Sequence, residues 1–139
     1  MQLSRRNAMA IGLGGVALAV LPRQVRAATV EELTAAFAGG AAVGTGGLTL
    51  TAPEIAENGN TVPISVSAPG AAAIMLIATG NPTPAVGTFN FGPAAGSQAV
   101  STRIRLAKTQ DVIAMAKMAD GSVVQAQATV KVTIGGCGG

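Results

Sequence analysis

The strongest constraint on the fold is a strict alternation of apolar and polar residues near the end of the chain. From Val124 to Ile134 every second residue is Val, Ala or Ile, and the residues between them are Gln, Thr or Lys. Successive side chains of a β-strand point to opposite faces, so this pattern predicts one long strand with a buried face and an exposed face. Half-buried strands of this kind are typical of antiparallel sheets packed on a core.

Six further segments have strand character and are separated by turn residues. Together with 124–134, the predicted strands are 48–51, 61–67, 72–78, 86–91, 100–106 and 111–118. Clusters such as Asn58-Gly59-Asn60 and Gly80-Asn81-Pro82 between them are typical of turns. About seven strands at this spacing predict a mainly β fold, an immunoglobulin-like antiparallel β-sandwich.

A short helix is predicted before the strands. Thr29 can cap it with Glu32 three positions later, and Gly39-Gly40 ends it. Within strand 61–67, Pro63 has no N–H to donate, so we expect this strand at a sheet edge or its proline facing away from the neighbour.

The strand 111–118 is apolar on both faces between Val112 and Ala116. Two interpretations remain open at this stage. Either a partner protein covers one of the faces, or the core is simply built from small, alanine-rich side chains.

The first 27 residues have the pattern of an export signal. Ser4-Arg5-Arg6 resembles a twin-arginine motif and precedes an apolar stretch, 10–21, that is too short for the ~20 residues of a membrane-spanning helix. We expect cleavage after Ala27, no membrane anchor and a periplasmic protein. The mature chain then has one domain, 28–134, followed by a terminal arm, 135–139. The alternative is that the leader forms a helix buried in the fold.

The composition excludes several classes of function. The sequence has no His and a single Cys, so it offers no His-dependent nucleophile, no His-ligated metal and no Cys-cluster metal site. Three Phe are the only aromatic residues, which leaves few platforms for stacked bases. The net charge of +3 comes from the leader, because five Lys and Arg face six Asp and Glu from residue 28 onward. We therefore expect no catalytic residues, no cofactor, no metal and no nucleic-acid partner.

The only thiol lies in the terminal sequence Gly135-Gly136-Cys137-Gly138-Gly139. Glycines provide no side-chain packing and leave the backbone free, so we expect a flexible arm that presents Cys137 up to roughly 10 Å beyond the last strand. With no histidine to activate it, an ordinary thiol with a pKa of about 8.5 is poorly suited to catalysis by itself. Cys137 is therefore predicted to carry a group for other enzymes. The alternative is an interaction module whose cysteine forms an inter-chain disulfide.

Several longer segments also resemble one protein family. These are Glu57-Asn58-Gly59-Asn60-Thr61-Val62-Pro63-Ile64-Ser65-Val66, Val100-Ser101-Thr102-Arg103-Ile104-Arg105-Leu106, Ala119-Asp120-Gly121, and 130–139 with the terminal Gly-Gly-Cys-Gly-Gly. Together they resemble SoxY, the sulfur-carrying subunit of the periplasmic thiosulfate-oxidising system.

The resemblance implies a carrier and not an enzyme. Cys137 would hold a thiosulfate-derived cysteine S-thiosulfonate, and Gly135, Gly136, Gly138 and Gly139 would form the swinging arm. The implied permanent partner is a SoxZ-like subunit, in a heterodimer. The implied transient partners are a haem enzyme, a manganese hydrolase and, where present, a molybdenum sulfane dehydrogenase, and the cofactors belong to them.

Overall fold

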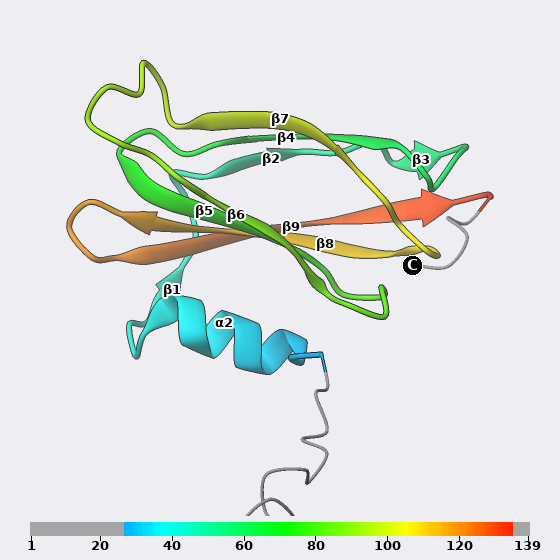
Figure 1. The fold of residues 1–139 in the computed structure, drawn as a ribbon, viewed down its shortest axis with the longest axis horizontal. Helices are drawn as coiled ribbons and strands as arrows, with labels where there is room; N and C mark the ends of the chain where they lie inside the picture. Colours follow the sequence, from blue (N-terminus) through cyan, green and yellow to red (C-terminus); the bar gives the residue numbers. More distant parts are fainter. Residues whose placement is uncertain (1–26, 135–139) are drawn as a thin grey trace, which may run out of the picture.

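The protein is described by a computed structural model over residues 27–134, in which one helix and nine strands form two sheets and a covering layer (Figure 1). In chain order the elements are α2 (Val30–Ala38), β1 (Val43–Gly44), β2 (Thr49–Thr51), β3 (Ile55–Ala56), β4 (Val62–Ser67), β5 (Ala71–Ala78), β6 (Ala85–Asn90), β7 (Ala99–Ile104), β8 (Gln110–Met118) and β9 (Val123–Val132). The larger sheet has the order β1-β9-β8-β5-β6, with β3 also paired to β9, and the smaller sheet has the order β2-β4-β7.

The predicted β-sandwich is confirmed. Each of the seven predicted strands corresponds to one of β2 and β4 to β9, with ends that differ by no more than two residues. The prediction missed β1 and β3, which have two residues each and pair parallel with β9. A strand of two residues contains no alternation to detect, so only its partner defines it.

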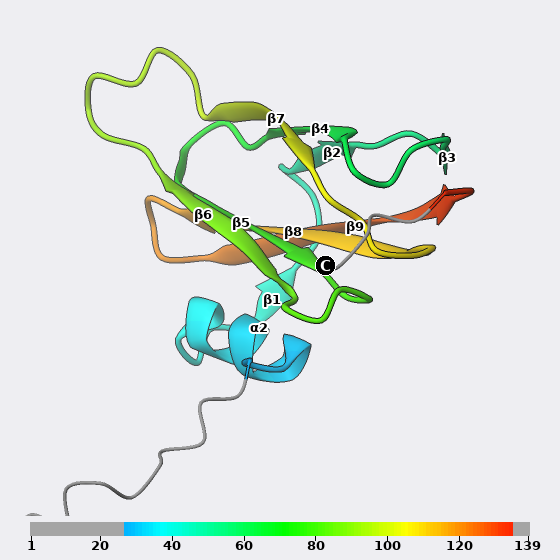
Figure 2. The same ribbon diagram turned by 45° about the vertical axis from the view of Figure 1, so that its right-hand side comes forward.

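The main core lies between the two sheets. Every second residue of β4 points inward, and Val62, Ile64 and Val66 are almost fully buried against residues of the larger sheet such as Ile74 and Leu76. Figure 2 shows β2, β4 and β7 as a layer over β5, β8 and β9. Each fully buried aliphatic side chain stabilises such a core by roughly 1.5–3 kcal/mol.

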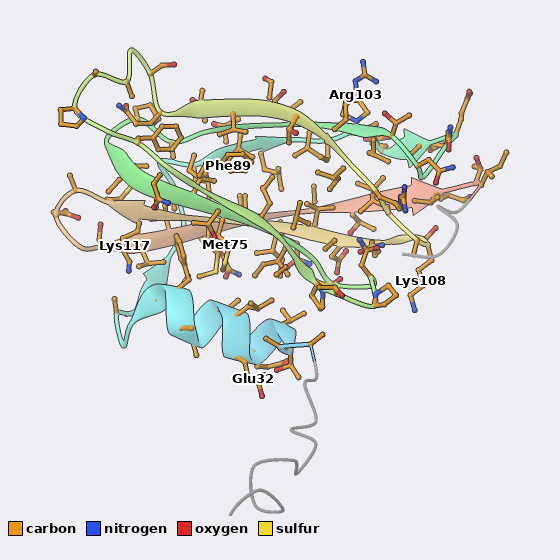
Figure 3. The ribbon with its side chains drawn as sticks, viewed as in Figure 1. Glu32, Met75, Phe89, Arg103, Lys108 and Lys117 are labelled. Carbon is orange, nitrogen blue, oxygen red and sulfur yellow. The ribbon has the colours of Figure 1, made fainter. Side chains whose placement is uncertain are left out.

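A second core lies on the outer face of the larger sheet, beneath α2. Met75, Ile77, Ile113 and Met115 are buried there, and Val30, Leu33 and Phe37 from the helix side pack against them. Figure 3 shows Met75 on the side of the sheet that faces α2, and Phe89 between the two sheets. The protein's own helix therefore covers the second apolar face of β8. Neither interpretation of the sequence, a partner protein or a core of small side chains, had included this cover.

The helix has the predicted ends. Thr29 accepts a hydrogen bond from the Glu32 N–H (3.2 Å), and the Glu32 carboxylate accepts one from the Thr29 N–H (3.0 Å). Gly39 is in the left-handed region, with φ 59°, and its N–H donates to the Ala35 carbonyl. Among residues 27–134 no helix is long and apolar enough to cross a membrane.

Strand 61–67 is not at an edge, because β4 is the middle strand of the smaller sheet. The other expectation, that Pro63 faces away from its neighbour, is confirmed: the Ala68 N–H donates to the Gln98 carbonyl, so alternate residues of β4 face β7 and Pro63 does not. β2 pairs only with Ser65, Val66 and Ser67, so at Pro63 the strand has β7 as a paired neighbour on one side only. The missing N–H is accommodated where the other side has no paired strand.

The turn between β8 and β9 is stabilised by a carboxylate. Asp120 Oδ1 accepts hydrogen bonds from the Ser122 hydroxyl (2.6 Å) and the Ser122 N–H (2.9 Å), and Gly121 takes a φ of 88°. These two hydrogen bonds hold the pKa of Asp120 below its ordinary value of 3.8, because they favour the charged form.

We expect Ile77→Ala to lower the free energy of unfolding by about 2–5 kcal/mol, because Ile77 is fully buried beneath the helix. Ile55→Ala is the matched control, since Ile55 is 58% exposed and its truncation should cost under about 0.5 kcal/mol. Denaturant unfolding followed by circular dichroism measures both. Equal losses in the two variants would contradict the second core.

We expect Ser122→Ala to raise the pKa of Asp120 toward its ordinary value, because the variant removes the stronger of the two donors. Because folding lowers the pKa of Asp120, the ionised carboxylate stabilises the folded protein at pH values above the ordinary pKa. This stabilisation is lost as the pH falls through the lowered pKa. A carbon-13 NMR titration of the Asp120 carboxyl checks this, with Ser101→Ala as the control on an exposed strand position. An unchanged Asp120 titration would contradict the assignment.

Candidate functional site

The predicted carrier residue and its arm lie just beyond the part of the chain that the structure describes. Cys137, Gly135, Gly136, Gly138 and Gly139 fall outside residues 27–134, as does the leader up to residue 26. The description ends at Ile134, three residues before Cys137. The observable part of the site is therefore Lys131 to Ile134, which we call the arm base.

The segment 54–59, which includes β3, holds one side of the arm base. Three backbone hydrogen bonds join them: Lys131 N–H to Glu54 O (2.9 Å), Thr133 N–H to Ala56 O (3.0 Å) and Gly59 N–H to Ile134 O (2.7 Å). The Thr133 hydroxyl also donates to the Glu57 carbonyl at 3.1 Å. Backbone pairing thus continues past the end of β9 to the last described residue.

The loop between β7 and β8 holds the other side. The hydroxyl of Thr109 accepts a hydrogen bond from the Val132 N–H (2.9 Å) and lies 3.4 Å from the Val132 carbonyl oxygen. One side chain therefore takes the place of a strand neighbour at this point of β9. In Figure 1 the end of β9, β3 and this loop lie at one end of the sandwich, opposite the β8–β9 turn.

A buried polar network fixes the loop that carries Thr109. Gln110 is 7% exposed, and its amide accepts from the Gly80 N–H (2.9 Å) and donates to Asn81 Oδ1 (2.9 Å). Asn81 Oδ1 also accepts from the Ala107 N–H at 2.9 Å. A Cβ added to Gly80 would lie 2.9 Å from the Cβ of Gln110, so this close approach requires glycine.

The described surface around the arm base is apolar in part. Ile134 is 67% exposed and Ile55, which pairs opposite Lys131, is 58% exposed. The nearby charges are the exposed Lys131, Glu54 and Glu57. Between residues 27 and 134 no group of three His, Cys, Asp or Glu side chains could hold a metal ion. The arrangement fixes the position of Ile134, the last described residue before the terminal segment.

The comparison with protein families decides the identity. The family described as sulfur oxidation protein SoxY matches residues 33–137, from within α2 to Cys137. The chain belongs to the SoxY family. The resemblance found in the sequence is thereby confirmed, and the family supports a role as a sulfur carrier that works with a partner of the Sox system such as SoxZ.

Solved structures agree with this assignment. The sulfur carrier protein SoxY from Chlorobium limicola f thiosulfatophilum is 34% identical, with a TM-score of 0.66 over 76% of this chain and 97% of that one. A superoxide reductase (neelaredoxin) from Ignicoccus hospitalis is 21% identical, with a TM-score of 0.55 over 63% of this chain and 81% of that one. The second likeness shows the fold alone. No match was found among curated proteins.

Sequence analysis missed the residues that hold the arm base. Thr109 lies in a loop with no periodic pattern, and its contact with Val132 spans 23 residues of sequence. The segment 54–59 contains the turn residues Asn58 and Gly59, but nothing local indicates that it pairs with β9. The alternating pattern of apolar and polar residues continues to Ile134. It was the one signal in the sequence that backbone pairing reaches this residue.

We expect Thr109→Val to increase amide hydrogen exchange at Val132 by about fivefold, because the substitution removes an acceptor worth about 1 kcal/mol. Thr49→Val is the matched control, since Thr49 is an exposed strand residue far along the chain from the arm base. Exchange monitored by NMR measures the effect. Unchanged exchange at Val132 in the Thr109→Val protein would show that the loop does not hold the arm base.

Proposed function

We propose that this protein is a covalent carrier of sulfur-oxidation intermediates and that Cys137 is the attachment site. The observation that carries the proposal is the extent of the family match, which reaches Cys137, the single cysteine of the sequence. A family of sulfur carriers needs a sulfur atom to which cargo is joined, and this chain has one thiol. The proposed cargo is a thiosulfate-derived cysteine S-thiosulfonate.

Loading is an oxidation that the chain cannot perform alone. Joining thiosulfate to the Cys137 thiol forms one S–S bond, releases the thiol proton and removes two electrons, which pass to a haem enzyme. The sequence has no histidine to act as a base near neutral pH. We therefore assign the chemistry to partner enzymes and the role of tethered substrate to this chain.

Unloading is hydrolytic. Water cleaves the bond between the sulfane sulfur and the sulfonate, sulfate leaves, and the sulfane sulfur stays on Cys137. A manganese hydrolase is the proposed catalyst. Where a molybdenum sulfane dehydrogenase is present, it oxidises the remaining sulfur, and a second hydrolysis regenerates the thiol.

The arm base supports this role by giving the arm a defined starting point. The Gly59 N–H holds the Ile134 carbonyl at 2.7 Å, and from there Gly135 and Gly136 lead to Cys137. Three extended residues span roughly 10 Å, and the glycines add no side-chain bulk. Such an arm, with Gly138 and Gly139 beyond the thiol, fits narrow active sites in several enzymes.

The proposal includes a stable partner and a location. A SoxZ-like subunit is the expected companion in a heterodimer. The segment 1–27, read as a twin-arginine signal, would deliver the folded pair to the periplasm together. The domain 28–134 then acts as the carrier body and 135–139 as its arm.

We expect Cys137→Ser to reduce thiosulfate-dependent electron transfer by at least about 100-fold in a reconstituted system, because no other side chain can hold the cargo. Intact-mass analysis of the wild type after growth on thiosulfate should show reducible sulfane or thiosulfonate adducts on the C-terminal peptide. The control Cys137→Ser/Thr49→Cys keeps one exposed thiol, but on strand β2, and should remain inactive.

Two other results would distinguish the carrier from the alternative, an interaction module with an inter-chain disulfide. If the wild type yields only doubled chains that a reductant separates, the terminal cysteine forms an inter-chain disulfide and the carrier function is wrong. Full activity of Cys137→Ser would exclude Cys137 as the attachment site.

A further inference from the structure

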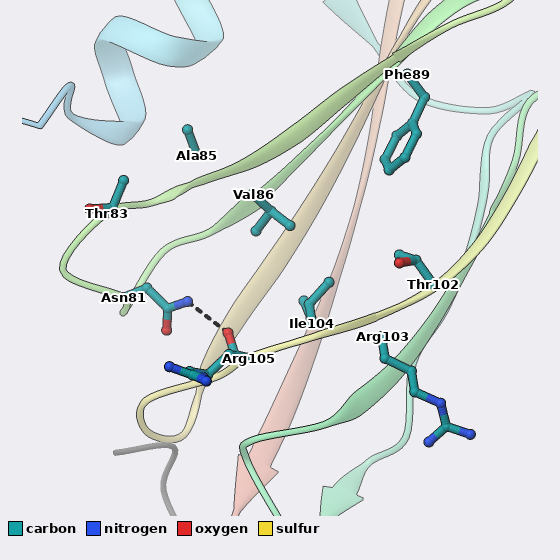
Figure 4. Close-up of a pocket in the computed structure, with 9 residues that line it drawn as sticks. All are labelled: Asn81, Thr83, Ala85, Val86, Phe89, Thr102, Arg103, Ile104 and Arg105. Atoms are coloured by element: carbon teal, nitrogen blue, oxygen red, sulfur yellow. Dashed lines mark hydrogen bonds between the residues drawn. The ribbon is translucent and has the colours of Figure 1, made fainter. Parts of the chain in front are cut away.

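Both sheets end in a free edge on the same side of the sandwich. β6 is the last strand of the larger sheet and pairs only with β5, and β7 is the last strand of the smaller sheet and pairs only with β4. A groove of about 380 Å³ lies between them. Figure 4 shows Val86 and Phe89 on one side of this groove and Ile104 on the other. We call it the β6–β7 groove.

The edge of β6 is built to accept another strand. The Phe91 N–H donates to the Ala72 carbonyl of the neighbouring segment. Because hydrogen-bonded positions alternate along an antiparallel pair, Phe89 also faces β5, while Thr88 and Asn90 present their backbone N–H and C=O groups outward. β6 contains no charged residue and no Pro, two of the features by which proteins usually protect an exposed edge, and its register shift against β5 lies at Val86, before Thr88 and Asn90.

The rim of the groove is cationic. Arg103 and Arg105 line it, and the Asn81 side-chain amide donates to the Arg105 carbonyl (2.8 Å), which holds this end of the groove in place (Figure 4). Between residues 58 and 110 the sequence has Arg103, Arg105 and Lys108 but no Asp or Glu. Both arginine side chains are exposed, so their guanidinium groups can meet an outside anion.

The charge pattern also indicates what covers the groove. An extended segment with outward N–H and C=O groups, apolar side chains toward Val86 and Phe89, and carboxylates toward the arginines would satisfy all three features. A second copy of this chain does not supply it. In the described part of the chain the edge strands are β1, β2, β3, β6 and β7, and none contains Asp or Glu. Glu54 and Glu57 flank the two-residue β3, but the carbonyls of Glu54, Ala56 and Glu57 already accept hydrogen bonds from Lys131 and Thr133.

We propose that the β6–β7 groove is the docking site for an acidic edge strand of the partner subunit, added to β6 and held by Arg103 and Arg105. This inference rests on the partnership with a SoxZ-like subunit proposed above, and adds where and how that subunit binds. The proposed contact uses none of residues 135–139, so docking and sulfur loading can be measured separately.

The test uses the full mature chain and the SoxZ-like subunit of the same organism, with the dissociation constant measured at low and moderate salt. Arg103→Glu/Arg105→Glu should weaken binding at least tenfold and flatten its salt dependence, because it reverses both rim charges. Lys117→Glu is the charge control on the opposite side of the larger sheet, where its Nζ lies 5.4 Å from the Phe37 ring centroid, and should change binding less than about twofold.

A backbone variant tests strand addition directly. Thr88→Pro removes an outward N–H without touching the β5 ladder and should weaken binding at least tenfold, whereas Thr88→Ala keeps the N–H and should bind like the wild type. On binding, amide exchange should slow at residues 85–90. Thermal unfolding of each variant confirms that it is folded.

The outcomes are distinct from those for the proposed function. Wild-type affinity in either Arg103→Glu/Arg105→Glu or Thr88→Pro overturns the groove as the docking site, as does failure of the wild type to bind the subunit. Cys137→Ser should dock normally even though it carries no sulfur. A protein that docks as expected but never shows an adduct would leave this inference intact and refute the carrier role.

Discussion

The pairing of β9 is the interaction on which the rest of the structure depends. β9 is registered with β8 over eight residue pairs, from Gln110–Val130 to Lys117–Val123, and its other edge carries β1 and β3. Val130 is fully buried in the main core. Backbone pairing continues through the Gly59–Ile134 hydrogen bond, so it reaches the last described residue, three positions before Cys137 in the sequence.

Small side chains allow both faces of the larger sheet to be covered by a chain of this length. Ala78, Ala114 and Ala116 are fully buried between the sheets, where they let β4 and β7 approach closely, and Ile113 and Met115 fill the outer face beneath α2. In the result, the central strands β5 and β8 each pair with a neighbouring strand on both sides. Polar and charged groups are left to the edges and ends, which are the places where partners can reach them.

One end of the molecule and its open side have separate functions in the two proposals. The end with Thr109 and the segment 54–59 holds the arm base, and the side with β6 and β7 has the outer strands of both sheets and two exposed arginines. Superoxide reductases with the same fold share the sandwich, so the fold alone does not determine the activity. The match to the SoxY family, and not the fold, is what indicates a sulfur carrier.

Local patterns were sufficient for most of the fold. The alternation in β9, the capping residues Thr29 and Glu32 and the turn glycines act over a few residues, so the sequence predicted the helix, seven strands and the family. The Gly-Gly-Cys-Gly-Gly terminus identified Cys137 as the candidate site, which stays a prediction because it lies outside the described residues. Tertiary structure alone decided that α2 covers β8, that Pro63 lies in a central strand, and that Thr109 and Gly59 hold the arm base. The hydrogen bonds of Thr109 and Gly59 to the arm base join residues 23 and 75 positions apart, and no periodicity along the chain records which distant residue will supply a hydrogen bond or cover a face.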